Sequence, residues 1–239
     1  MSTIVTSRQR SAQRVKKLCV AAMFAALAFA SMFVMRINVM FLTCDVKDTV
    51  VTIAGLLLGP IYSLGISFLV ALLEFISIGD TGFWGLLMDF LSTAAFSCTC
   101  ALIYKYKKNI RGAIVGLVAA ALTMTAFMLL FNLFIVPLYT PGFTTAAVAA
   151  MVPKLFLPFN LTKGVLNAAL VLILYKPMSN AMKSIKMLPS SNMENSANKV
   201  DRNGHIKFSL MVTLAGVVAV AICLVVFFVF LNGSFSLIE

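Results

Sequence analysis

The stretch TVVTIAGLLLGPIYSLGISFLVALLEFISI, residues 49–78, decides the fold of this chain. Its 30 residues form either one long helix across a membrane or two helices that break at Gly59-Pro60. A proline inside a helix removes a hydrogen bond and clashes with the preceding turn, so a break is physically reasonable there. The two arrangements place every later segment on opposite sides of the membrane.

The distribution of Lys and Arg favours two helices. Cytoplasmic loops of membrane proteins carry an excess of these residues. With two helices, 15 of the 19 basic residues fall in cytoplasmic segments, three fall outside and Lys163 lies within a helix. With one helix, 6 fall inside and 12 outside. We therefore expect one helix over residues 49–58 and another over 60–78, with the N-terminus in the cytoplasm.

The composition agrees with an integral membrane protein. Hydrophobic residues make up 61% of the 239 residues and charged residues 11%, against about 45–50% and about 25% in soluble domains. The net charge of +11 is then expected to set orientation and not to bind nucleic acid. The five cysteines show neither a metal-binding nor a disulfide spacing. Motifs for binding nucleotide phosphates and for zinc or serine hydrolysis are absent, so we expect no enzyme, metal or cofactor.

The apolar runs predict an all-α integral membrane protein, a six-helix bundle followed by a seventh helix. A basic cytoplasmic N-terminus covers residues 1–17, and the six-helix domain with an outward-facing binding site covers 18–176. A polar cytoplasmic linker follows over 177–207, because this segment has few apolar residues with which to build a core. The additional helix covers 208–231. The six helices of the bundle are expected at 18–35, 49–58, 60–78, 83–104, 112–136 and 158–175.

Polar side chains gather near the outer ends of these helices. Charged groups are costly inside a membrane and commonly mark functional sites. Asn160, Lys163 and Asn167 share one face of the sixth helix, at a spacing of three and then four residues. The other members of the set are Asp45, Lys47 and Asp48 in the first outer loop, Glu74, Asp89 and Asn132. These groups either satisfy one another between helices, with Lys163 paired to Asp89 or Glu74, or line an outward-facing pocket; their shared depth favours the pocket.

A row of small residues runs along the first helix. Ala22, Ala26 and Ala30 follow one another at intervals of four residues. Such rows let two helices approach closely in a membrane. The spacing alone leaves open whether the partner helix lies within the bundle or in another subunit.

Four stretches resemble the substrate-binding (S) subunits of energy-coupling factor (ECF) vitamin transporters, specifically the riboflavin type. FLTCDVKDTVVTIAGLLLGP (41–60) is similar to their first loop and second helix, and DTGFWGLLMDF (80–90) to the entry of their fourth helix. MLLFNLFIVPLY (128–139) resembles their fifth helix, and LPFNLTKG (157–164) resembles the Pro-Phe-Asn-x-x-Lys-Gly motif of their sixth. The resemblance extends over about residues 15–177.

The resemblance implies a six-helix subunit in the cell membrane that binds a vitamin from outside. Such a subunit works with a transmembrane coupling subunit and two ATPase subunits, which hydrolyse ATP. Asn132, Asn160 and Lys163 match positions that hold the flavin in this family, with Asp45 and Asp48 near the same site. The alanine row Ala22, Ala26 and Ala30 resembles the motif that docks on the coupling subunit.

Two positions depart from the family pattern. Thr49 follows Asp48 where proline is frequent, and Asp89 stands where asparagine is common. We include Asp89 among the expected substrate contacts. Riboflavin is the expected ligand, while flavin mononucleotide, folate and pantothenate stay open. An autonomous secondary transporter of a small organic solute and a structural or regulatory protein without a ligand are the alternatives from other classes.

Overall fold

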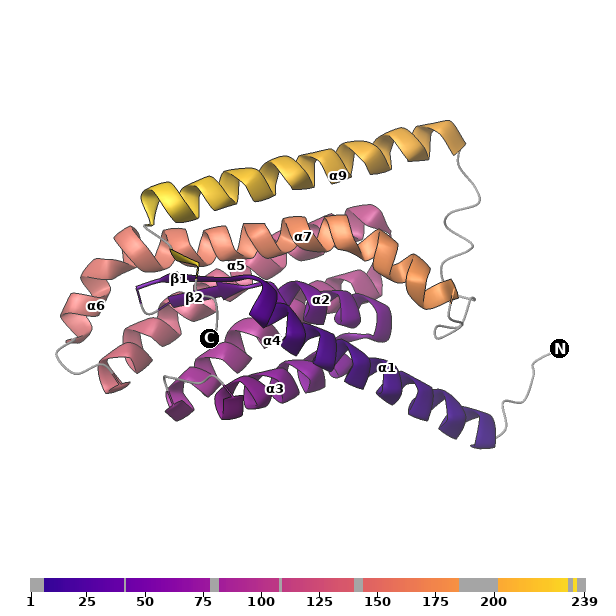
Figure 1. Cartoon of the computed structure of the whole chain (residues 1–239), viewed down its shortest axis with the longest axis horizontal. Coiled ribbons are helices and arrows are strands. Elements are labelled where there is room, and N and C mark those ends of the chain that lie inside the picture. Colours follow the sequence, from indigo (N-terminus) through magenta and orange to yellow (C-terminus); the bar gives the residue numbers. More distant parts are fainter. Residues whose placement is uncertain are drawn as a thin grey trace.

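A computed structural model describes residues 7–40, 42–77, 82–107, 109–139, 144–184, 202–231 and 234–235. The described chain is almost entirely helical, with a small three-stranded sheet at one end of a helix bundle (Figure 1). Its helices and strands are α1 (Ser7–Val34), β1 (Arg36–Val39), β2 (Leu42–Asp45), α2 (Lys47–Leu58), α3 (Pro60–Ser77), α4 (Gly82–Tyr106), α5 (Ile110–Tyr139), α6 (Thr145–Met151), η1 (Val152–Phe156), α7 (Leu157–Ser184), α9 (Arg202–Val225), η3 (Val226–Phe230) and β3 (Ser234–Phe235).

The chain breaks at Gly59-Pro60, as the basic residues predicted. Helix α2 ends at Leu58, and α3 begins at Pro60. Gly59 adopts φ +109°, a conformation that favours glycine, and its N–H caps α2 by donating to the Gly55 carbonyl at 2.8 Å. The proline fits because the first turn of a helix does not need its missing N–H.

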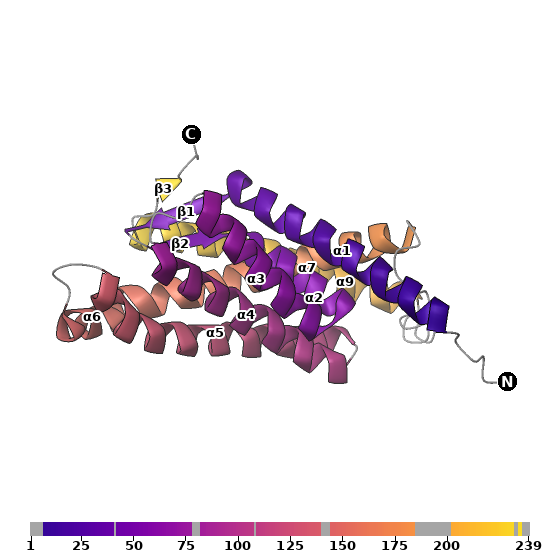
Figure 2. The same ribbon diagram turned by 90° about the horizontal axis from the view of Figure 1, so that it is seen from below.

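Helix α2 is short and lies in the centre of the bundle. Its 12 residues span about 18 Å, less than the roughly 30 Å of a membrane's hydrocarbon core. All of them except Leu57 are buried. The sequence predicted an irregular loop before this helix; the structure instead has the antiparallel hairpin β1–β2, in which Arg36 pairs with Asp45. The hairpin lies against the bundle, so α2 begins among the other helices (Figure 2).

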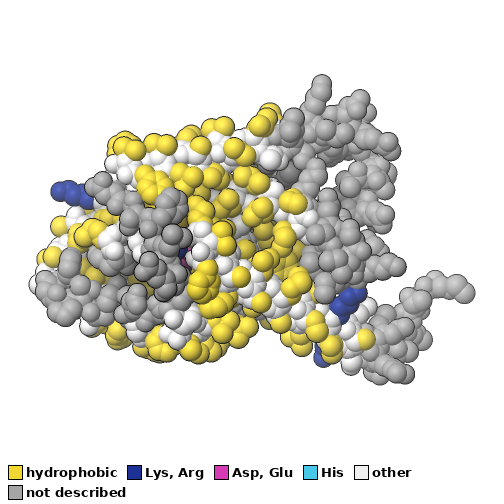
Figure 3. Space-filling model, viewed as in Figure 1, with side chains coloured by type: hydrophobic (Ala, Val, Ile, Leu, Met, Phe, Trp, Pro, Cys, Tyr) yellow, Lys and Arg dark blue, Asp and Glu magenta, His cyan; other side chains and the backbone are white. Residues whose placement is uncertain are grey.

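Six segments within the described residues are long and apolar enough to cross a membrane: Ser11–Val34, Pro60–Ser77, Gly82–Tyr106, Arg111–Leu138, Thr145–Tyr175 and Thr213–Phe230. On the face shown in Figure 3, hydrophobic side chains cover most of the middle of the molecule, and the most prominent Lys and Arg side chains lie towards the two ends. An exposed surface of this kind suits contact with lipid.

Several helix ends differ from the sequence expectation. Helix α5 continues through Pro137 to Tyr139, because a proline so close to a helix end disturbs only the turn before it. The helix expected from residue 158 is preceded by α6 and by the π-helical turn η1, which lead directly into it. Helix α7 runs to Ser184, and α9 begins at Arg202. Residues 185–201 of the expected linker and 1–6 of the expected N-terminal segment lie outside the described residues.

Candidate functional site

A cavity of about 370 Å³ lies at the end of the bundle where the hairpin is found, which we call the pocket end. Its volume falls in the range of pockets that hold small organic ligands. The hairpin, α3, α4, α5 and α7 all contribute to its wall. The polar and aromatic lining residues are Arg36, Asn38, Thr43, Asp45, Glu74, Phe75, Asp89, Ser92, Asn132, Phe159, Asn160 and Lys163.

Lys47 lies at the centre of an acidic cluster in the wall of the cavity. Its ammonium forms ion pairs with Glu74 and Asp89 and lies 3.3 Å from Oδ2 of Asp45. Only 1% of the Lys47 side chain is exposed. Burial alone would lower the pKa of this ammonium, but the surrounding carboxylates outweigh burial and raise its pKa well above the ordinary value. The lysine is therefore a fixed positive charge.

The three carboxylates of this cluster stand close enough to hold a metal ion. One oxygen from each of Asp45, Glu74 and Asp89 lies within 4.8 Å of the others. The Lys47 ammonium contacts all three side chains, and Arg36 adds a second positive charge 3.7 Å from Glu74. The chain's own cations therefore take the place that a metal would fill.

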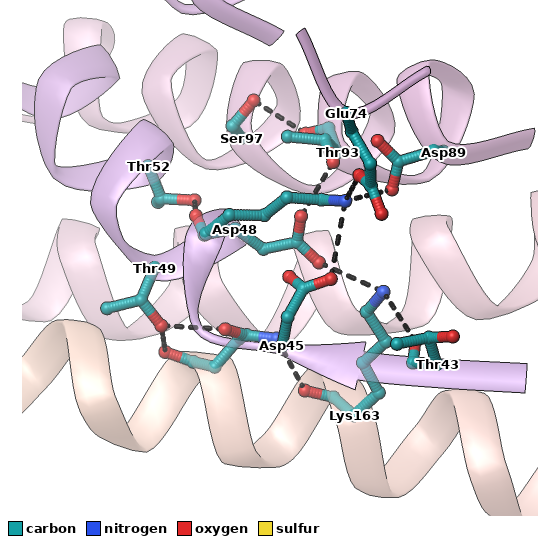
Figure 4. A network of polar contacts seen from close by, with 12 residues as sticks. Thr43, Asp45, Asp48, Thr49, Thr52, Glu74, Asp89, Thr93, Ser97 and Lys163 are labelled. Carbon is teal, nitrogen blue, oxygen red and sulfur yellow. Dashed lines mark hydrogen bonds and ion pairs between the residues drawn. The ribbon is translucent and has the colours of Figure 1, made fainter. Parts of the chain in front are cut away.

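A second ion pair stands apart from the first. Lys163 Nζ lies 3.4 Å from Oδ2 of Asp48 and donates to the Thr43 carbonyl at 3.4 Å. Asp48 is fully buried and accepts a hydrogen bond from Thr93 Oγ1 at 2.6 Å. Figure 4 shows the side chains of Asp45, Asp48 and Lys163 directed toward one another. Lys163 is thus paired with Asp48, whereas the sequence offered Asp89 or Glu74 as its partner.

Two asparagines present amide groups to the cavity. Asn132 donates from Nδ2 to the Met128 carbonyl at 2.7 Å, and Asn160 donates to the Phe156 carbonyl at 2.8 Å. Each bond ties the side chain to its own helix and fixes its direction. No other side chain of the described residues bonds to the two amide oxygens, which leaves them as acceptors for a ligand.

Asn167 lies on the same face of α7 as Asn160 and Lys163, but it contacts α2 and does not line the cavity. It accepts a hydrogen bond from Thr49 Oγ1 at 2.7 Å. It joins α7 to α2 beneath the cavity. Of the polar face predicted on this helix, two members line the cavity and the third connects helices.

The structure brings most of the sequence-predicted site residues together. Asp45, Asp89, Asn132, Asn160 and Lys163 line the cavity, and Asp48 lies behind Lys163. Sequence analysis did not single out Arg36 or Asn38 as wall residues. The signal was present in the alternation of polar and apolar residues in RINV (36–39) and LTCD (42–45), a period of two that indicates strands with one face toward the cavity.

The three alanines predicted as a docking row lie on the outer side of α1. Ala22, Ala26 and Ala30 are exposed, while Ala25 and Ala28 on the other side of the helix are buried. The row is thus accessible at the surface of the subunit, and none of its three alanines lines the cavity.

The chain matches a family model and two characterised transporters. The model of the family described as the ECF transporter substrate-specific component matches residues 16–175. The riboflavin transporter RibU of Staphylococcus aureus (strain TCH60) is 29% identical over 188 residues, which cover 74% of this chain and 98% of RibU. The riboflavin transporter FmnP of Bacillus subtilis (strain 168) is 28% identical over 188 residues, covering 72% of this chain and 97% of FmnP.

A solved structure agrees with these matches. The S component of a bacterial ECF transporter superposes with a TM-score of 0.60 at 28% identity, covering 71% of this chain and 99% of that one. The family match includes every residue that lines the cavity and ends at residue 175. Helix α9 and strand β3 lie beyond it.

Proposed function

The chain belongs to the family of substrate-specific components of ECF transporters, and on that premise we propose that it binds riboflavin in the cavity at the pocket end for uptake across the cell membrane. The observation that carries this proposal is the convergence of Asn132, Asn160 and Lys163 on one cavity, whose wall has both polar and apolar side chains. We propose riboflavin as the ligand because the chain is similar to RibU and FmnP, which are named riboflavin transporters.

The chemistry of the cavity suits a flavin ring. The ring system is largely apolar, and its uracil-like edge alternates hydrogen-bond donors and acceptors. An asparagine amide can both donate and accept, so Asn132 and Asn160 match such an edge. Lys163 donates to a ring carbonyl, and its pairing with Asp48 keeps the ammonium in place. Phe159 supplies an aromatic surface in the wall.

The pocket end is proposed to face the outside of the cell. At the opposite end of the bundle, Lys105 at the end of α4, Lys107 in the turn that follows and Arg111 at the start of α5 lie close together in the sequence. An excess of basic residues marks the cytoplasmic side of a membrane protein. Helix α1 also begins at that end (Figure 1), so the proposed orientation has the N-terminus in the cytoplasm.

Transport requires partners in this proposal. The exposed row Ala22, Ala26 and Ala30 docks against a transmembrane coupling subunit, since small side chains allow close helix approach. Two ATPase subunits bound to that partner hydrolyse ATP, and this chain acts as the binding subunit and not as an enzyme.

The test is uptake of labelled riboflavin by cells that lack other flavin uptake systems. Expression of this chain together with the coupling and ATPase subunits should give uptake that stops when ATP hydrolysis is blocked by a substitution in the ATPases. Uptake by this chain without the three partners would contradict the proposal and identify an autonomous secondary transporter.

A further inference from the structure

We propose that Phe227, at the end of the C-terminal helix, is a positioning residue that holds the wall of the cavity in its ligand-binding form. This inference rests on the proposed function, because the ligand used to test it is riboflavin. Phe227 belongs to η3, in the part of the chain that the family match does not cover. It does not line the cavity itself.

Phe227 lies directly behind an aromatic residue of the cavity wall. Its ring centroid is 5.7 Å from that of Phe159, with the two rings at 76° in an edge-to-face contact. Phe227 is fully buried and Phe159 nearly so. Phe159 stands next to Asn160, so a shift of its ring changes the place where the ligand binds.

The same C-terminal segment supports the hairpin from behind. Along the hairpin, Asn38, Thr43 and Asp45 line the cavity. Their neighbours Ile37 and Cys44 point to the other face, since successive residues of a strand alternate. These two side chains are fully buried in one apolar cluster with Phe159, Leu166, Cys223 and Phe227.

Strand β3 adds backbone contacts to this support. It pairs with β1 on the edge that β2 leaves free, with Ile37 opposite Phe235 and Asn38 opposite Ser234. A two-stranded hairpin of four-residue strands is marginally stable alone, and a third strand with an apolar backing stabilises it. Pairing also covers an otherwise open strand edge.

Close packing against α7 holds helix α9, and with it Phe227, next to the cavity wall. The helix packs along α7 (Figure 1). At Gly216 the two helices approach so closely that an added Cβ would lie 3.0 Å from Ile173 and 3.3 Å from the Ala169 carbonyl oxygen. Helix α9, which leads directly into η3 and Phe227, therefore packs closely against α7, the helix that carries Asn160 and Lys163.

The consequence is a preorganised site. A wall that is held in place before the ligand arrives loses less conformational freedom on binding, and this favours slow ligand release. Removing the Phe227 ring should loosen the hairpin and Phe159 while leaving the contacts of Asn132 with Met128 and of Lys163 with Asp48 in place.

The test compares Phe227→Ala with Phe230→Ala in the full-length protein in lipid nanodiscs. Phe230 lies three residues later and is 77% exposed, so it controls for the loss of a ring from the same helix end. We expect Phe227→Ala to speed riboflavin release by about tenfold, a change of about 1.4 kcal/mol. Backbone amides of residues 36–45 should also exchange hydrogen faster without ligand. Phe230→Ala should change neither the rate of riboflavin release nor the hydrogen exchange of residues 36–45. Phe227→Leu should release riboflavin almost as slowly as the unaltered protein.

Unchanged release and unchanged amide exchange in Phe227→Ala would overturn the inference. Faster exchange in α3 and α4 as well as in the hairpin would also overturn it, because Phe227 would then be a general structural residue. If the unaltered protein binds no riboflavin, the proposed function fails, and the claim that Phe227 sets the rate of flavin release fails with it.

Discussion

Lys163 Nζ lies 3.4 Å from Oδ2 of Asp48, whose other oxygen accepts a 2.6 Å hydrogen bond from Thr93. Three elements, α7, α2 and α4, thus meet in one chain of contacts that ends at the cavity. Asp48 is held by Thr93 and in turn orients the ammonium of Lys163. The lysine ammonium is therefore held at the cavity by a partner that does not line the cavity.

Thr93→Val tests this relay. Valine has the shape of threonine without the hydroxyl, so Asp48 loses a hydrogen bond at a buried oxygen while packing is preserved. Loss of a hydrogen bond to a charged group costs about 1.5–3 kcal/mol, part of which should appear as weaker riboflavin binding. Isothermal titration of the purified protein measures the change. Ser77→Ala, which removes an exposed hydroxyl on α3, is the control, and equal affinities in the two variants would contradict the relay.

Lys47→Met tests the acidic cluster. The substitution leaves Asp45, Glu74 and Asp89 close together without the ammonium that contacts all three. Removing one partner of a buried ion pair typically costs about 3–5 kcal/mol, so the thermal unfolding midpoint should fall clearly. Lys154→Met, at an exposed lysine of η1, is the matched control. A midpoint unchanged from the parent would show that Lys47 does not stabilise the cluster.

Membrane orientation is tested by thiol labelling in a variant whose natural cysteines have been replaced. A cysteine at Gly82, at the pocket end, should react with an impermeant reagent added to intact cells. A cysteine at Asn109, in the turn at the opposite end, should react only after the membrane is opened. Both positions are exposed, so access to the reagent depends on the side of the membrane. The reverse pattern would contradict an outward-facing cavity.

Ala26→Trp tests the docking row on α1. An indole prevents close approach of a partner helix, so riboflavin uptake should fall strongly while binding to the isolated subunit stays unchanged. Leu122→Trp places the same indole at an exposed site on α5 and should leave uptake intact. Loss of binding together with uptake in Ala26→Trp would place the defect inside the subunit.

The sequence predicted the helices better than the contacts between them. The break at Gly59-Pro60 could be predicted because proline acts locally on the helix and the basic residues of the successive loops can be counted along the sequence. The partner of Lys163 could not: the sequence offered Asp89 or Glu74, which the structure pairs with Lys47, and only the packing of α2 against α4 and α7 brings Asp48 to Lys163. The sequence placed Lys47 in the first outer loop. In the structure it is the first residue of α2 and is buried.

The C-terminal strand shows the same limit. Residues 208–231 predict a helix by composition, but nothing in the sequence indicates that Ser234–Phe235 pairs with Arg36–Val39, about 200 residues away. Strand pairing over such a distance depends on the fold that brings the two segments together. The alternation of residues 36–45 was the available signal for the hairpin itself.

The most direct test of the account is a flavin fluorescence titration of the purified protein alongside Asn160→Ala and Lys163→Ala. The parent should bind riboflavin at one site. Each substitution leaves a polar group of the ligand unpaired, which costs about 1–3 kcal/mol and should weaken affinity by about ten- to a hundredfold. Absence of binding in the parent would contradict riboflavin as the ligand, and unchanged affinity in both variants would contradict the proposed site.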